Sequence, residues 1–118
     1  MSFKTIKTDR YTLIQFSTDK LDAIVSPDLK AELVFINKQG EKNILVDLGS
    51  VKYCDSSGLS ALLIGNRICN EANGCFILSS LQPTVKKLII ISQLDTILKI
   101  KTTPKEAIDS LSTDELES

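Results

Sequence analysis

Residues 44–72 read ILVDLGSVKYCDSSGLSALLIGNRICNEA, and this stretch decides the fold. It starts inside a strand predicted over Asn43–Leu48, whose continuous aliphatic run suits a strand covered on both faces of a parallel or mixed sheet. A short loop follows. Apolar residues then recur through a helix predicted from about Ser57 to Ala72, where Asn73-Gly74 ends it. A buried strand that leads into a helix is typical of an α/β sheet domain.

Two strands and a helix are predicted upstream of this stretch. Phe3–Thr8 and Tyr11–Ser17 are rich in Thr, Ile, Phe and Tyr, and they form a hairpin around a turn at Asp9-Arg10. The next helix begins at Ser26, whose hydroxyl is placed to cap it, and the proline that follows suits a first helical position.

Strands and helices also alternate downstream. Cys75–Ser79 and Leu98–Ile100 are short strands, and a helix opens at Pro83 between them. The sequence Thr103-Pro104-Lys105-Glu106 combines a cap, a proline and a capping-box glutamate, so it predicts the start of a terminal helix.

The bulk composition fits one soluble domain. The chain has 118 residues, 42% of them hydrophobic and 25% charged, and we predict a domain over 1–111 with a polar, acidic, frayed tail over 112–118. A net charge of −1 gives no electrostatic footprint for nucleic acid or an anionic membrane, and the longest aliphatic run is far too short to span a bilayer. The N-terminus lacks the apolar stretch of a signal peptide. Free thiols in a reducing cytosol best explain the odd set of cysteines, Cys54, Cys69 and Cys75.

The absence of histidine makes an enzyme less favoured. It removes serine and cysteine triads and the common zinc sites, although a carboxylate or lysine base stays possible. A nucleophile elbow needs a glycine two residues on each side of the serine, whereas Ser56 has Cys54 before it and Gly58 after it.

The segment Asp55-Ser56-Ser57-Gly58 lies at the entrance of the central helix. Free N–H groups at a helix N-terminus favour a negative group, so a phosphoserine there gains hydrogen bonds without refolding of the chain. The alternative is that these residues only cap the helix, as at any helix start.

The helix that follows, Leu59–Cys69, is apolar nearly all round in its first turns. One face must cover the sheet, and the other would leave leucines near solvent beside the serines, as at a protein partner site. Alternatively, the whole helix is enclosed in the core.

In their order along the chain, these motifs resemble the STAS domain family, specifically its single-domain anti-sigma factor antagonists. The resemblance spans nearly the whole chain and is carried by Leu21-Asp22-Ala23, Ser26-Pro27, Ile44–Leu48, Asp55–Leu59, Leu81 with Pro83 and Val85, Leu94-Asp95, and Thr103–Ala107. It implies an α/β fold with a mixed β-sheet of about four to five strands, flanked by about four helices, with an N-terminal β-hairpin.

The resemblance also implies a partner-switching role in transcription regulation. The unphosphorylated protein would bind an anti-sigma factor that is also a serine kinase, and so release a sigma factor. Phosphorylation of Ser56, or as second choice Ser57, would end that binding, and a phosphatase would restore it. ATP and magnesium would belong to the kinase, and this chain would hold no cofactor or metal. The predicted partner-binding residues are Asp22, Ser26, Asp55, Ser56, Ser57, Gly58, Leu59, Ser60, Leu62 and Leu63.

Another STAS role is the main rival. The chain could be a scaffold of a stress-signalling complex, or an accessory subunit of a membrane transporter, without a phosphate switch. In either role we predict a cytoplasmic protein that is not an enzyme. It would be a monomer or weak dimer, with no direct nucleic acid binding and no membrane insertion.

Overall fold

The computed structural model describes the backbone of residues 2–117 and the side chains as far as Leu111. Its centre is a five-stranded sheet in the order β1-β2-β4-β6-β7. Strands β1 (Phe3–Lys7) and β2 (Thr12–Phe16) are antiparallel, which confirms the predicted N-terminal hairpin. A hydrogen bond from Thr8 N to Tyr11 O at 2.8 Å closes the turn between them.

The remaining strands of this sheet run parallel to β2. They are β4 (Ile44–Asp47), β6 (Phe76–Ser79) and β7 (Lys99–Lys101). The predicted mixed sheet is therefore confirmed. Strand side chains alternate between the two faces, so Val46 packs in the larger apolar core while its neighbour Leu45 packs in the smaller core on the other face.

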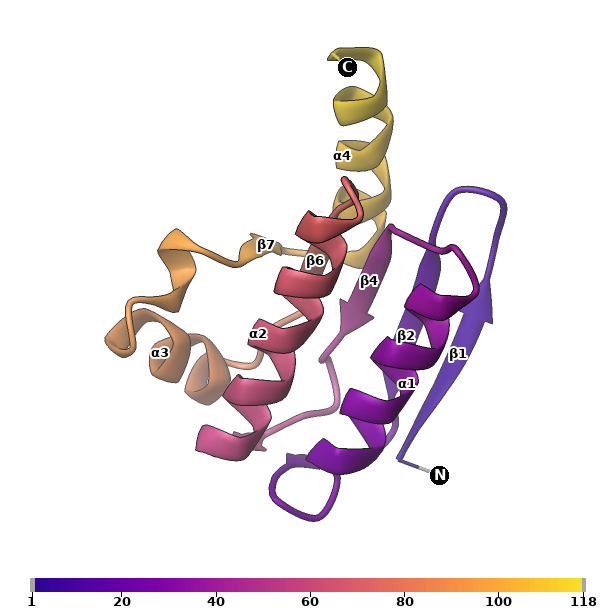
Figure 1. Ribbon diagram of the computed structural model, residues 1–118. Coiled ribbons are helices and arrows are strands. Elements are labelled where there is room, and N and C mark those ends of the chain that lie inside the picture. Colours follow the sequence, from indigo (N-terminus) through magenta and orange to yellow (C-terminus); the bar gives the residue numbers. More distant parts are fainter. Residues whose placement is uncertain (1, 118) are drawn as a thin grey trace.

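The helices lie on both faces of the sheet. Figure 1 shows α1 (Ser26–Lys38) and α2 (Ser56–Glu71) side by side on one face, with α3 (Pro83–Ile91) on the far side of α2 from α1. Helix α4 (Pro104–Glu117) contacts β4, β6 and β7 from the opposite face. None of the helices within residues 2–117 is long and apolar enough to cross a membrane.

A second, two-stranded sheet was not predicted. Strand β3 (Lys20–Leu21) pairs in parallel with β5 (Tyr53–Cys54). Strands this short carry no periodic pattern that a sequence could reveal. The pair joins the segment before α1 to the segment before α2, so the N-termini of the two helices become neighbours.

The predicted cap of α1 is wrong. Ser26 is the first residue of the helix, and Val25 occupies the cap position. The Ser26 hydroxyl donates a hydrogen bond to the backbone oxygen of Asp22 at 2.6 Å, so it does not accept one from the helix. No side chain caps α1, and Ser26 N instead donates a hydrogen bond to the backbone oxygen of Asp22 at 2.8 Å.

Other helix boundaries lie close to their predicted places. α2 begins at Ser56, one residue before the prediction. α4 has the predicted cap, because the Thr103 hydroxyl accepts a hydrogen bond from Glu106 N at 3.1 Å. Its backbone stays helical as far as Glu117. The side chains of residues 112–118 lie outside the described part, so the tail stays a prediction. The 3₁₀ turn η1 (Leu94–Thr96) was not predicted.

Candidate functional site at the N-terminus of α2

Asp55 caps helix α2 and leaves Ser56 exposed. The Asp55 backbone is extended (φ −110°, ψ −173°), and its Oδ1 accepts a hydrogen bond from Gly58 N at 3.0 Å. The capping interpretation is therefore right for Asp55. Ser56 is the first helical residue and is exposed, so it stands at the positive end of the helix dipole without serving as the cap.

The loop that carries Asp22 lies beside this helix start. Leu21 is paired with Cys54 in the small sheet, and Asp55 N donates a hydrogen bond to Leu21 O at 3.3 Å. Asp22 is half-buried, and its Oδ1 accepts hydrogen bonds from two backbone N–H groups of its own loop at 3.1 and 3.2 Å. These bonds hold the carboxylate in place. Two negative side chains, Asp22 and Asp55, therefore stand at the entrance of the helix that begins with Ser56.

Gly58 allows the two loops to approach this closely. A Cβ atom at this position would lie 2.5 Å from Leu21 O and 2.7 Å from Cys54 Sγ, much closer than real side chains approach such atoms. Gly58 itself is buried. Its role in the structure is to admit the β3 segment against the first turn of α2.

Several predicted partner-binding residues are buried and present no side chain to a partner. They are Ser26 at 1% exposed, Leu59 at 9%, Leu62 at 0%, and Gly58. The proposed leucine face of α2 is therefore wrong for Leu59 and Leu62, which pack in the main core. The apolar residues run nearly all round the first turns because neighbouring elements enclose them. Of the remaining predicted residues, Ser56 and Ser60 are exposed, and Asp22, Asp55, Ser57 and Leu63 are half-buried.

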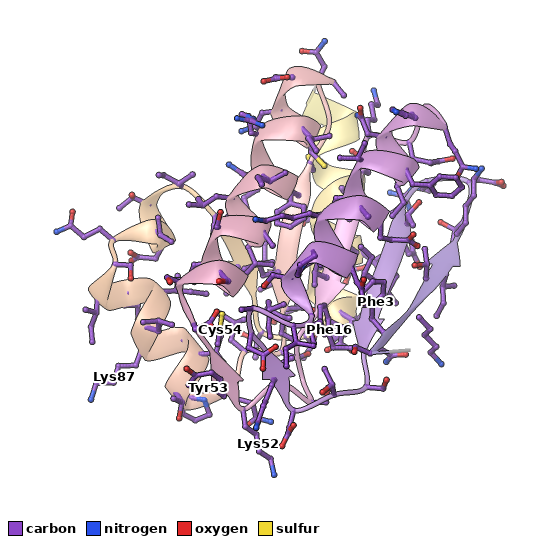
Figure 2. All side chains as sticks on the ribbon, turned by 60° about the horizontal axis from the view of Figure 1, so that its bottom comes forward. Phe3, Phe16, Lys52, Tyr53, Cys54 and Lys87 are labelled. Atoms are coloured by element: carbon purple, nitrogen blue, oxygen red, sulfur yellow. The ribbon has the colours of Figure 1, made fainter. Side chains whose placement is uncertain are left out.

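Two exposed apolar residues near Ser56 were missed. Ile24, in the Asp22 loop, is 83% exposed, and Tyr53, in β5, is 50% exposed. Figure 2 shows Tyr53 and Lys52 projecting from the lower edge of the molecule, whereas Cys54 lies further inward. Strand alternation could have indicated Tyr53 once β5 was known. No pattern marks Ile24, a single apolar residue in a loop.

The thiol beneath this site is inert. Burial, and to a smaller extent the nearby Asp55 carboxylate, raises the pKa of Cys54 to about 12. Burial also raises the pKa of Cys69 to about 12. Both side chains stay protonated at neutral pH, so neither supplies the thiolate that nucleophilic chemistry needs. This edge therefore presents the exposed Ser56 hydroxyl together with the Asp22 and Asp55 carboxylates and the exposed side chains of Ile24 and Tyr53.

Comparisons of the sequence find related proteins. The sequence model of the STAS domain matches residues 3–107. BtrV of Bordetella bronchiseptica, named as a candidate anti-sigma factor antagonist, is 28% identical over 85 residues, which are 72% of this chain and 73% of BtrV.

Solved structures share the fold. The crystal structure of a candidate anti-sigma factor antagonist from Thermotoga maritima has a TM-score of 0.85 at 24% identity and covers 93% of this chain and 94% of its own. The Bacillus cell fate determinant SpoIIAA, solved in its phosphorylated form, has a TM-score of 0.73 at 25% identity and covers 92% of this chain and 98% of its own.

Proposed function

The chain belongs to the STAS domain family, and from this premise we propose that it is an anti-sigma factor antagonist switched off by phosphorylation of Ser56. The observation that carries the proposal is the exposed first residue of α2, left accessible because Asp55 supplies the cap. The names of BtrV and of phosphorylated SpoIIAA support it. Ser57 is half-buried and is the second choice.

The partner surface of this proposal surrounds Ser56. Ile24 and Tyr53 supply exposed apolar area, and Asp22 and Ser60 supply polar contacts around it. Apolar anchors inside a polar rim are the usual arrangement of a protein interface, and aromatic residues are often its strongest contacts. These two residues replace the buried Leu59 and Leu62 as the proposed apolar anchors.

Electrostatics supplies the switch. Phosphate adds a charge of about −1.5 to −2 at neutral pH, and here it would stand near the carboxylates of Asp22 and Asp55. Inside a dry interface, a negative charge without a partner costs about 2–5 kcal/mol, which lowers affinity about 30-fold to several thousand-fold. In the free protein, water and the N-terminus of α2 stabilise the phosphate. The switch therefore needs no large rearrangement of the chain.

The chemistry of transfer belongs to the partners. An anti-sigma factor with serine kinase activity supplies ATP and magnesium, the Ser56 hydroxyl accepts the phosphate, and a phosphatase removes it. In this proposal the chain is not an enzyme and needs no cofactor. It acts in the cytoplasm as a monomer or weak dimer.

Capture followed by phosphate mapping tests this function. The tagged chain is incubated with lysate of its own organism and ATP, ADP or no nucleotide, and captured proteins and phosphorylated peptides are identified by mass spectrometry. We expect capture of an ATP-binding anti-sigma factor with ADP, and phosphate on Ser56 after incubation with ATP. The Ser56→Ala variant should lose the phosphate, while the control variant Ser92→Ala, an exposed serine at the end of α3, keeps it. Capture of a transporter ATPase without any anti-sigma factor would instead favour the accessory-subunit role.

A further inference from the structure

Strand β7 forms an open edge of the five-stranded sheet. It pairs with β6 on one side, from Ile77 with Lys99 to Ser79 with Lys101, and no other strand within residues 2–117 pairs with its outer side. An outer strand presents backbone N–H and C=O groups that can pair with another chain. Partner segments use such edges when adjacent pockets receive their side chains.

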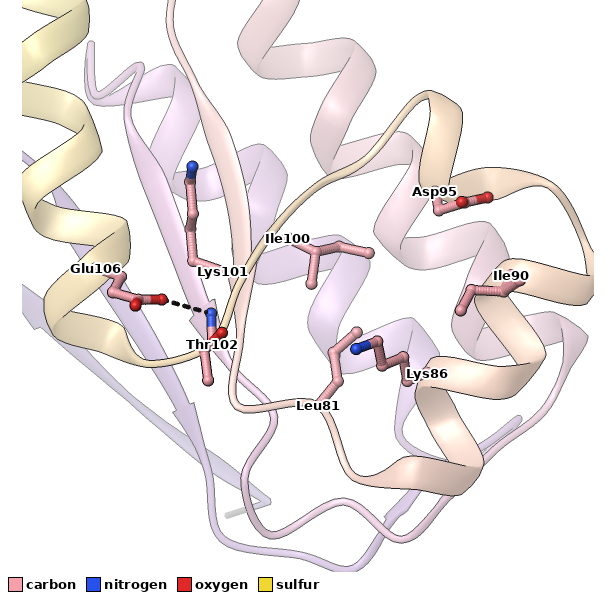
Figure 3. A pocket seen from close by; sticks show the side chains of 8 residues that line it. All are labelled: Leu81, Lys86, Ile90, Asp95, Ile100, Lys101, Thr102 and Glu106. Atoms are coloured by element: carbon pink, nitrogen blue, oxygen red, sulfur yellow. Dashed lines mark hydrogen bonds between the residues drawn. The ribbon is translucent and has the colours of Figure 1, made fainter.

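A groove lies between this edge and α3. It has a volume of about 380 Å³, and its apolar lining comes from Leu81, Ile90 and Ile100. Figure 3 shows Ile100 pointing from β7 toward α3, with the Lys86 ammonium group close to Leu81. Ile90 is 49% exposed even though it lines the groove, so this apolar surface is open to solvent.

A second hollow lies on the α4 side of the same strand. It has a volume of about 330 Å³ and is lined by Lys99, Ile100, Lys101 and Ser110. Lys99 and Lys101 flank Ile100 in sequence, so strand alternation places their side chains on the face opposite to it. Ile77, the register partner of Lys99, belongs to the core under α4, which agrees with this placement.

Charge also distinguishes this side of the molecule. Residues 83–101 contain four lysines and one aspartate, in a chain whose net charge is −1. Among the acidic residues of the groove, Glu106 already accepts a hydrogen bond from Thr102 N at 3.0 Å. Figure 3 places Asp95 at the far end of the groove, beyond Ile90. A partner segment that covers β7 therefore meets Ile100 on the groove face of the strand and Lys99 on the opposite face, while the long side chain of Lys101 lines both hollows.

We propose that the β7 edge binds an extended segment of a partner protein in which acidic and aliphatic residues alternate. The segment pairs with β7 as an added strand and places an aliphatic side chain in the groove beside Ile90 and Ile100. Its acidic neighbours then point to the other face, toward Lys99 and Lys101. The alternation of acidic and aliphatic residues is expected because side chains of a strand point to alternate faces and pair with the side chains of β7 on the same face. Ser56 lines neither hollow, so this binding does not require the unphosphorylated state.

Peptide titration of the full chain, followed by amide NMR spectra, tests this proposal. The probe is a synthetic peptide in which glutamate alternates with valine, and the control peptide has lysine in place of every glutamate. We expect the glutamate peptide to bind at least tenfold more tightly, with the largest shifts at residues 99–101 and slower amide exchange along β7. Equal binding of the two peptides, no binding, or shifts confined to other strands would overturn the proposal.

A charge swap sharpens the test. The double variant Lys99→Glu with Lys101→Glu should reverse the preference, so that the lysine peptide binds more tightly. The matched variant Lys52→Glu, an exposed lysine at the Ser56 edge, should leave the preference unchanged. If the double variant does not fold, Lys101→Gln replaces it and should lower the affinity for the glutamate peptide. Free glutamate serves as a further control. NMR shifts of the same size with the amino acid alone would mean that the lysines only bind an anion, and this result would overturn the proposal that the peptide pairs with β7 as a strand.

Discussion

Ser26 and Ser56 each stand at the first residue of a helix, but their surroundings differ. Ser26 starts α1, is 1% exposed, and donates its hydroxyl proton to the backbone oxygen of Asp22. Ser56 starts α2, is exposed, and follows Asp55, which accepts the capping hydrogen bond. The two serines therefore differ in burial and in hydrogen bonding, although neither is the cap of its helix.

The largest expected loss of stability comes from the buried face of α2, in contrast to the exposed Ser56 at its first residue. Leu62→Ala should lower the free energy of unfolding by about 2–5 kcal/mol, because Leu62 is fully buried in the core. Leu63→Ala, at the half-buried neighbouring position, should cost about 1–2 kcal/mol. Urea denaturation measures both. If the Leu62→Ala variant were as stable as the wild type but unable to bind its partner, Leu62 would belong to a partner-binding face and the core assignment would be wrong.

The two serines should differ in stability by a smaller amount. Ser26→Ala removes a buried hydrogen bond and should cost about 1 kcal/mol, since the Asp22 oxygen keeps its bond from Ser26 N at 2.8 Å. Ser56→Ala should change the stability by less than about 0.5 kcal/mol, because the residue is exposed and does not cap the helix. Thermal or urea unfolding of the two variants compares them directly. Equal losses would show that Ser56 also supports the fold.

A further effect appears only at alkaline pH and concerns the thiol below Ser56. Burial holds the pKa of Cys54 at about 12, whereas the unfolded thiol ionises near its ordinary value of 9. Between these values the unfolded chain has lost a proton that the folded chain keeps, so the stability falls as pH rises through this window. The Cys54→Ala variant should therefore lose less stability than the wild type between pH 9 and about 10.5. If the free energy of unfolding fell equally with pH in the two proteins, this result would contradict the buried state of the Cys54 thiol.

Local signals in the sequence predicted much of the fold. The hairpin, the α4 cap at Thr103 and the helix start near Asp55 depend on residues close together in sequence, so their side-chain chemistry was enough. The β3–β5 pair was missed because two-residue strands have no period. Its contact with α2 explains why Gly58 is buried, and core packing accounts for Leu59. The prediction for Ser26 was wrong because its hydroxyl donates a hydrogen bond to the backbone oxygen of Asp22, four residues earlier, and so does not accept one from the helix.

The central claim is that phosphate on Ser56 ends partner binding. The direct measurement is calorimetry in the presence of ADP. It compares the affinity of the captured anti-sigma factor for the unphosphorylated chain with its affinity for the chain phosphorylated at Ser56. We predict an affinity lower by about 30-fold to several thousand-fold for the phosphorylated chain. Equal affinity, with mass spectrometry showing the phosphate on Ser56, would contradict the account.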